Sequence, residues 1–195
     1  MVALLALGVL IGALVYLHAA PTGLSPVRNA VSQYGISRYA GGYRIATIAF
    51  AVAGAALAVG VERALAVSGR GAVVVLLVVF AVARALISWF PMDAPGAPPT
   101  STGRRHGLLA FLAFTAVALA AFRLASALGS GTRWHALAPA SSVLAWAMTV
   151  CLVSMASARS APWARARFGA VERLFYLCAI AWVGIFATAC AAGLG

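Results

Sequence analysis

The segment from Phe90 to Gly107, FPMDAPGAPPTSTGRRHG, holds the side chains of this sequence that are best suited to chemistry. It contains Asp93, the single aspartate of the chain, and His106, one of three histidines. Glu172, near the start of the last apolar stretch, is predicted to lie on the same membrane face. Carboxylates and an imidazole that lie together can act as general acid and general base. One hypothesis is therefore a membrane enzyme that acts on a lipid or prenyl substrate, with Asp93, His106 and Glu172 as catalytic residues.

The same face could also hold a metal ion. Two histidines and two carboxylates can bind zinc and activate a water molecule. The candidate ligands are His18, Asp93, His106 and Glu172. These residues are scattered along the chain, and no H-E-x-x-H or comparable spacing accompanies them. The sequence therefore favours no metal and no other cofactor.

A second hypothesis is an anion-binding pocket built from arginines and helix starts. Arg44, His106 and Glu172 are predicted to begin the second, fourth and sixth apolar helices on one face. Free backbone N–H groups and dipole ends at helix N-termini favour an anion. The ligand would be an anionic amphiphile, such as a phospholipid or an isoprenoid phosphate. Its candidate binding residues are Arg28, Ser32, Tyr34, Arg44, Arg84, Thr100, Arg104 and Arg105.

Structural explanations are open for several of these residues. Arg84 falls inside the third apolar stretch, where a charge is costly, and Asp93 or Glu172 could be its ion-pair partner. Asp93 could instead pair with another nearby arginine, and His106 could lie in the lipid headgroup region without a ligand. A third hypothesis is thus a structural or accessory membrane subunit, in which these polar residues matter only for stability.

The elements that would position these residues are transmembrane helices. Of the 195 residues, 64% are hydrophobic and 9% are charged, with a mean hydropathy of +1.02, whereas a soluble domain carries roughly 25% charged residues. Six apolar runs are long enough to span roughly 30 Å of hydrocarbon. We therefore predict an all-α, polytopic integral membrane protein that forms a single domain over residues 1–195. Its six transmembrane helices are expected at approximately 2–20, 44–66, 71–90, 107–127, 137–157 and 172–193.

The fourteen basic residues are all arginine and give a net charge of +11. In a chain this apolar, loop arginines orient helices and contact anionic headgroups, so we expect membrane lipids as partners and no nucleic acid. The first, third and fifth connections share one side of a six-span protein. That side has Arg28, Arg38, Arg44, Arg104, Arg105, Arg159, Arg165, Arg167 and Arg173, and the other has Arg63, Arg70, Arg123 and Arg133. The positive-inside rule then places the odd-numbered connections in the cytoplasm and both termini outside the cell membrane. The oligomeric state has no sequence signature.

Local signals refine the connections. Met1 to Ala20 lacks a basic n-region, which favours a retained helix over a signal peptide. In the first connection, SPVRNAVSQYG is consistent with a short interfacial helix closed by Gly35. In the third connection four prolines restrict the loop, and Thr100 or Ser101 is a candidate cap for the next helix.

Three stretches, HAAPTGLSPVRNAVSQYG, FPMDAPGAPPTSTGRRHG and VERLFY, resemble the bacterial membrane family of domain of unknown function 998. The family pattern has a Ser-x-Tyr-like element after the first helix and an F-P-x-D, T, G, H element before the fourth. The matching positions are Ser32, Tyr34, Phe90, Pro91, Asp93, Thr100, Gly103 and His106. The resemblance covers nearly the whole chain and implies a six-helix bundle, but it implies no activity. A distant similarity to eukaryotic Frag1/DRAM-type membrane proteins, in helix number and polar helix ends, adds no chemistry.

Overall fold

The structure is a computed structural model that describes residues 1–65, 69–129, 134–158 and 160–193. Every regular element in these ranges is helical, and six helices are long and apolar enough to cross a membrane. The long helices are α1 (Val2–Ala19), α2 (Ala40–Ala64), α3 (Arg70–Leu86), α4 (Ser101–Ala127), α5 (Ala138–Ser157) and α7 (Phe168–Gly193). The short ones are η1 (Val31–Ile36), η2 (Ile87–Trp89), η3 (His135–Leu137) and α6 (Pro162–Ala166). The predicted all-α, six-span architecture is confirmed.

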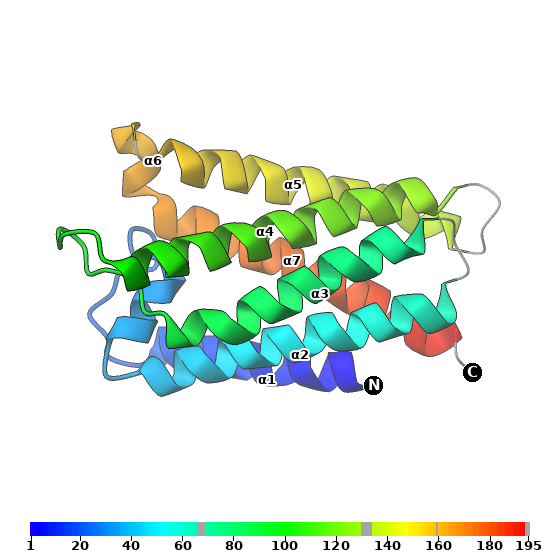
Figure 1. Cartoon of the computed structure of the whole chain (residues 1–195), viewed down its shortest axis with the longest axis horizontal. Helices are drawn as coiled ribbons and strands as arrows, with labels where there is room; N and C mark the ends of the chain where they lie inside the picture. Colours follow the sequence, from blue (N-terminus) through cyan, green and yellow to red (C-terminus); the bar gives the residue numbers. More distant parts are fainter. Residues whose placement is uncertain (66–68, 130–133, 159, 194–195) are drawn as a thin grey trace.

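The long helices run up and down in an antiparallel bundle (Figure 1). Each helix packs against the one before it, from α1 to α5, α5 packs against α7, and α7 returns to α1 and also crosses to α2. In α2 and α7, 56% of the most apolar window is buried, compared with 22% in α5. The two central helices are therefore α2 and α7, and α5 presents most of its surface to lipid.

Small residues allow the central helices to approach closely, as is common where lipid supplies no hydrophobic driving force. A Cβ on Gly54 of α2 would lie 2.6 Å from the Phe80 ring of α3, so only glycine fits there. Phe80 also packs edge-to-face on Phe50, with ring centroids 4.9 Å apart. This aromatic pair lies beneath the polar region described below.

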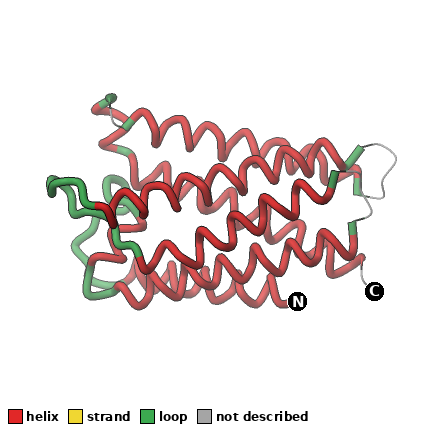
Figure 2. Tube along the Cα trace, viewed as in Figure 1, coloured by secondary structure: helices red, strands yellow, loops and turns green. Residues whose placement is uncertain are grey.

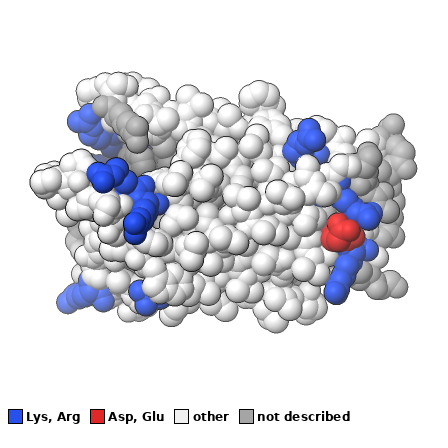
Figure 3. Space-filling model, in the orientation of Figure 1, with Lys and Arg blue, Asp and Glu red and all other residues white. Residues whose placement is uncertain are grey.

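The two ends of the bundle differ. Both termini lie at one end, which we call the terminal end, and the loops that carry η1, α6 and the α3–α4 connection gather at the other, which we call the loop end (Figures 1 and 2). Arginines cluster at both ends, with a wide uncharged belt between them (Figure 3). The prediction that the odd-numbered connections share one side is confirmed. Arg133 and Arg159, which entered the charge comparison, lie outside the described residues.

Three helices begin earlier than predicted. The starts of α2, α4 and α7 are Ala40, Ser101 and Phe168, where the apolar pattern placed them at 44, 107 and 172. Arg44, His106 and Glu172 therefore lie within the first two turns at similar depth, and the free N–H groups of the helix starts lie nearer the interface. Gly, Ser and Thr in these first turns resemble loop in composition, which is why the starts were missed.

The first connection also differs from prediction. Instead of an interfacial helix closed by Gly35, it forms a turn over 26–28 followed by the 3-10 helix η1. Gly35 lies inside η1, and a Cβ there would lie 2.8 Å from the Tyr43 ring. The glycine serves the close packing of η1 on α2 rather than a helix cap.

Candidate functional site

The α3–α4 connection is closed by a small hydrogen-bonded motif around Asp93. One carboxylate oxygen accepts the Thr100 hydroxyl at 2.6 Å, and the other accepts the Thr100 N–H at 3.1 Å. The Thr100 hydroxyl oxygen in turn accepts the Gly103 N–H at 3.0 Å and caps α4. These bonds to Thr100 hold the pKa of the Asp93 carboxyl below its usual value. Thr100, rather than Ser101, is therefore the cap.

Gly103 and His106 complete the same closure. A Cβ on Gly103 would run into the Asp93 carboxylate, so this position requires glycine. The buried His106 ring donates from Nδ1 to the Phe90 carbonyl at 2.8 Å, which ties α4 to the end of η2. The polar residues of the F-P-x-D, T, G, H element thus satisfy one another, and their geometry holds a loop.

Glu172 serves a second junction, between α7 and the first connection. Its buried carboxylate accepts the Val31 N–H at the start of η1, at 2.6 Å. The Glu172 side chain is therefore the acceptor for a backbone N–H that the first turn of this 3-10 helix leaves free. Because Asp93, His106 and Glu172 each have a separate partner, no hydrogen bond in the described part of the chain joins any two of the three.

Arg173, the next residue, was not among the predicted site residues. Its Nη1 donates to the carbonyls of Asn29 and Gly169 at 2.8 and 2.9 Å. Its Nη2 donates to the Tyr34 hydroxyl at 3.3 Å, and its Nε donates to His18 Nε2 at 2.6 Å. The His18 Nδ1 lies 2.7 Å from the Leu14 carbonyl, so the neutral tautomer with a proton on Nδ1 satisfies both contacts.

A groove of about 690 Å³ runs between α1 and α7 and ends at this arginine. Most of its lining is aliphatic, and its polar side chains are His18, Arg173 and Tyr176. His18 and Arg173 lie at the loop end of α1 and α7, whereas the aliphatic part reaches toward the middle of the bundle. The lining residues are Ile11, Leu14, Val15, His18, Ala19, Val31, Arg173, Tyr176, Leu177 and Ile180.

Arg84 lies inside the bundle and is 1% exposed. Its guanidinium carbon lies 5.2 Å from the Tyr176 ring centroid and 5.6 Å from that of Phe50, and the Tyr176 hydroxyl is a hydrogen-bond partner. Its Nε and Nη2 atoms have no hydrogen-bond partner in the part of the chain that the structure describes. The expected ion pair with Asp93 or Glu172 is wrong, because the ion pair found within 4.0 Å among the described residues joins Arg70 to Glu62 at the terminal end. The same observation overturns the alternative that Asp93 pairs with an arginine.

The remaining predicted arginines lie on the surface of the loop end. Arg28, Arg44, Arg104 and Arg105 are all exposed. The Arg44 guanidinium lies over the Trp89 ring at 5.3 Å, and that of Arg105 lies over Phe90 at 5.7 Å. Of the predicted hydroxyl residues, Ser32 donates to the Met92 sulfur at 3.1 Å, and Tyr34 is buried against Arg173. The predicted arginines are therefore not together in one pocket. Arg84 is buried inside the bundle, and the other four are exposed on the surface of the loop end.

The four candidate zinc ligands are likewise engaged separately, His18 with Arg173 and the other three as described. Over residues 1–65, 69–129, 134–158 and 160–193, no group of three or more His, Cys, Asp or Glu side chains is placed to hold a metal ion.

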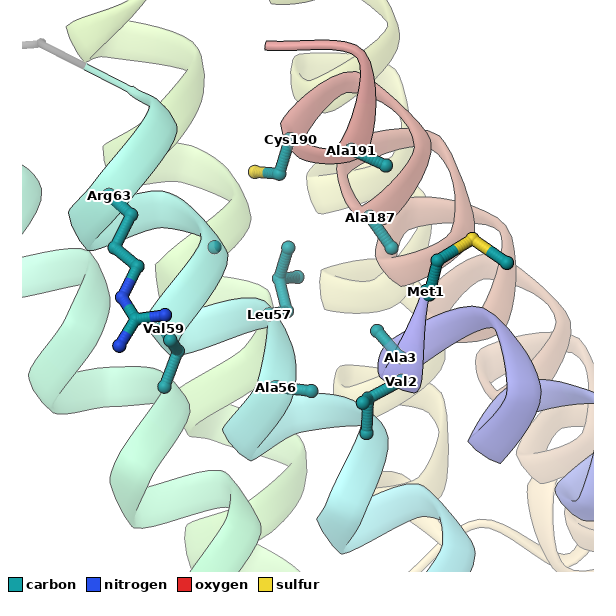
Figure 4. Close-up of a pocket in the computed structure, with 11 residues that line it drawn as sticks. Met1, Val2, Ala3, Ala56, Leu57, Val59, Arg63, Ala187, Cys190 and Ala191 are labelled. Carbon is teal, nitrogen blue, oxygen red and sulfur yellow. The ribbon is translucent and has the colours of Figure 1, made fainter. Parts of the chain in front are cut away.

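The terminal end has a smaller pocket of about 350 Å³ between α1, α2 and α7 (Figure 4). Cys190 and Ala187 of α7, Leu57 of α2 and Met1 line it, with Arg63 at its edge. The Cys190 side chain points toward α2, where a Cβ on Gly60 would lie 3.1 Å from the cysteine Cβ. Tight, largely apolar packing explains this region without a ligand.

The fold and the arginine-capped ends define a multi-pass membrane protein of the six-helix class. A family model for a protein of unknown function (DUF998) matches residues 4–189. The chain therefore belongs to that family, as the polar motifs predicted. Comparison with curated proteins and with solved structures gives no match, so the distant similarity to Frag1/DRAM-type proteins gains no support.

Proposed function

We propose that this membrane protein binds an anionic amphiphile, a phospholipid or an isoprenoid-type phosphate, in the groove between α1 and α7. The observation that carries the proposal is the lining of the groove, which is aliphatic toward the bundle centre and ends at Arg173 and His18. The hydrocarbon chain lies along Leu14, Leu177 and Ile180, and the negative head group lies at the Arg173 end.

The head group decides the specificity of such a site. Lipid tails are as apolar as the groove, so the aliphatic wall by itself gives little preference over the surrounding bilayer. Arg173 supplies the preference, because a guanidinium has five N–H groups and four of them are used in the hydrogen bonds to His18, Asn29, Gly169 and Tyr34. One N–H on Nη2 and the whole positive charge are left for a ligand.

The charge of Arg173 has no carboxylate within 4.0 Å among the described residues. The partners that fix its guanidinium are carbonyls, a hydroxyl and a neutral imidazole. A cation held rigidly by neutral groups is pre-organised for an anion, since its orientation is set before the ligand arrives. The bilayer itself supplies anionic headgroups at this depth.

The proposal is tested by cross-linking the full chain in nanodiscs. Phosphatidylglycerol and phosphatidylcholine with photoreactive acyl chains are compared at equal molar fraction. Phosphatidylglycerol is expected to label α1 and α7 residues of the groove preferentially, and phosphatidylcholine is expected to label all lipid-facing helices alike. Equal labelling by both lipids, with the exposed Val143, Val150 and Val153 of α5 labelled as strongly as Leu177, would contradict the proposal.

We also propose that the protein lies in a bacterial cell membrane with its loop end facing the cytoplasm, because most described arginines lie at that end. The loop end has Arg28, Arg38, Arg44, Arg104, Arg105, Arg165, Arg167 and Arg173, against Arg63, Arg70 and Arg123 at the terminal end. The positive-inside rule relates such a bias to orientation. Alkaline phosphatase fused after the last residue should then be active and a fluorescent protein fused there should be dark, and the reverse pattern would invert the orientation.

A further inference from the structure

A second group of buried polar atoms lies on α3 and η2, and Tyr176, which also lines the lipid groove, contacts it. Ser88 follows Arg84 by four residues, across the junction of α3 with η2. Within the described ranges, the Ser88 hydroxyl oxygen is buried without a hydrogen-bond partner, as are Nε and Nη2 of Arg84. We propose that Arg84 and Ser88 form a binding site for an oxyanion, the phosphate or carboxylate group of a ligand, inside the loop end of the bundle.

The physical reason is the free-energy cost of burying polar atoms that form no hydrogen bond. A buried polar group without a partner destabilises a fold, and a buried cation does so more strongly. Three such atoms one turn apart are unusual, because native structures pair the large majority of buried polar atoms. An oxyanion meets all three requirements at once, since it accepts hydrogen bonds from the guanidinium and the hydroxyl and neutralises the charge.

The surroundings fix the arginine but do not neutralise it. Phe50 and Tyr176 flank the guanidinium, and Tyr176 forms a hydrogen bond with it. The largest electrostatic interactions of Arg84 are with Tyr176, Tyr43 and Glu172. His106 also interacts electrostatically with the Arg84 guanidinium. Glu172 is the only carboxylate of this set, and it accepts the Val31 N–H instead of forming an ion pair with Arg84 within 4.0 Å. The guanidinium is therefore oriented by neutral groups, as Arg173 is.

The polar surface of the loop end lies next to Ser88 in the chain. Trp89 follows Ser88 directly, is exposed, and carries the Arg44 guanidinium over its ring at 5.3 Å. Arg44 is itself exposed at the loop end. An exposed arginine thus lies against the residue next to Ser88, and a buried arginine lies four residues before it.

The test is a titration of the delipidated full chain in a neutral detergent, with inorganic phosphate as the probe and thermal unfolding as the readout. Wild type is expected to gain thermal stability with phosphate, and Ser88→Ala is expected to need about tenfold more phosphate for the same gain, the loss of one charge-assisted hydrogen bond. Arg84→Met should show no phosphate-dependent gain. Ser126→Ala, whose hydroxyl bonds within its own helix at 3.1 Å, is the matched control and should behave as wild type.

The ligand-free proteins give an opposite and independent expectation. Removing a polar group that has no partner costs little, so Ser88→Ala should unfold at or above the wild-type temperature without phosphate. A clear loss of stability in Ser88→Ala without phosphate, or a phosphate-dependent gain that is equally large in Ser88→Ala and wild type, would overturn the proposal. Absence of any effect of phosphate on wild type would overturn it for a free anion, and it is then tested with a lipid head group.

The lipid arm uses nanodiscs of phosphatidylglycerol or phosphatidylcholine. A stabilisation by phosphatidylglycerol that Ser88→Ala weakens identifies a lipid phosphate as the occupant. If neither phosphate nor phosphatidylglycerol distinguishes Ser88→Ala from wild type, the site is refuted. The outcome is separate from that of the α1–α7 groove, because Leu177→Trp blocks the groove and should leave the phosphate titration unchanged.

Discussion

The α3–α4 connection and the Arg84–Ser88 turn are both polar and lie close along the chain. They differ in whether their polar side chains have hydrogen-bond partners. In the connection, the Asp93 carboxylate, the Thr100 hydroxyl and the His106 ring all have partners within 3.1 Å. In the turn, three buried polar atoms have none. The comparison indicates that the residues with the most reactive side chains hold a loop, whereas the arginine in the apolar stretch keeps unpartnered donors among the described residues.

The difference also explains why residue type alone misleads in this chain. Asp93, Thr100 and His106 lie within fourteen residues and have side chains typical of catalytic sites. Each of them instead forms a hydrogen bond that holds the proline-rich loop against the start of α4. The hydrogen-bond partners of a polar group distinguish a structural role from a binding role. A structural polar group finds its partners within the protein, and a binding group finds them in its ligand.

The largest loss of stability is expected from a substitution whose added volume disrupts the hydrogen bonds of the α3–α4 connection. Gly103→Ala places a methyl group where the Asp93 carboxylate lies, so the Asp93–Thr100 bonds must open, at a cost of about 2–3 kcal/mol of unfolding free energy. Gly107→Ala is the matched control, since nothing lies within 4 Å of its added Cβ. Thermal unfolding in detergent should show a loss for the first variant and a small gain for the second. A Gly103→Ala variant as stable as wild type would refute the closure.

A smaller loss is expected for the cap itself. Thr100→Ala removes the acceptor of the Gly103 N–H and the donor to Asp93, which should cost about 1–2 kcal/mol. Thr100→Ser keeps the hydroxyl and should cost a few tenths of that. Equal unfolding temperatures for Thr100→Ala and Thr100→Ser would show that the hydroxyl is not the stabilising group.

His106 separates a structural from a catalytic or ligand-binding role. His106→Ala removes the bond to the Phe90 carbonyl and should lower stability by about 1 kcal/mol. Because the ring lies in the closure rather than in the α1–α7 groove, lipid that co-purifies with the protein should be unchanged. The comparison would fail if His106→Ala kept full stability and lost the lipid.

The smallest effect is a pH dependence at Asp93. Its pKa is lowered in the folded protein by the bonds from Thr100, so its contribution to stability is complete above the unfolded value of about 3.9 and is lost as pH falls through the lower folded pKa. Unfolding followed from pH 6 downward should show this loss, and Thr100→Ala should reduce it. An acid loss of the same size in Asp93→Asn would assign it to other groups.

The lengths of the apolar runs were sufficient to predict the number of helices, their order and the shared side of the odd-numbered connections. They misplaced the starts of α2, α4 and α7, because Ala40–Gly42 and Ser101–Gly103 resemble loop in composition and become helical through capping and packing. Thr100 could be predicted as a cap because the signal is local.

The site was harder to predict, since its key contacts join distant segments. Arg173 was counted only as a loop charge, and its role follows from contacts with His18, Asn29 and Tyr34, which lie more than a hundred residues away in the sequence. Ser88 gave no signal, because its significance is the lack of a partner in the folded chain. The VERLFY motif was the one available pointer, and it drew attention to Glu172 rather than to the arginine beside it.

Lipid retention by two tryptophan variants of α7 tests the proposed groove most directly. Leu177 lines the groove, whereas Leu174, on the same helix and similarly exposed, does not. In native mass spectrometry of the protein extracted in a mild detergent, wild type and Leu174→Trp should retain an anionic amphiphile, and Leu177→Trp should lose most of it. Equal retention by all three proteins, or retention of zwitterionic lipid alone, would contradict binding of an anionic amphiphile between α1 and α7.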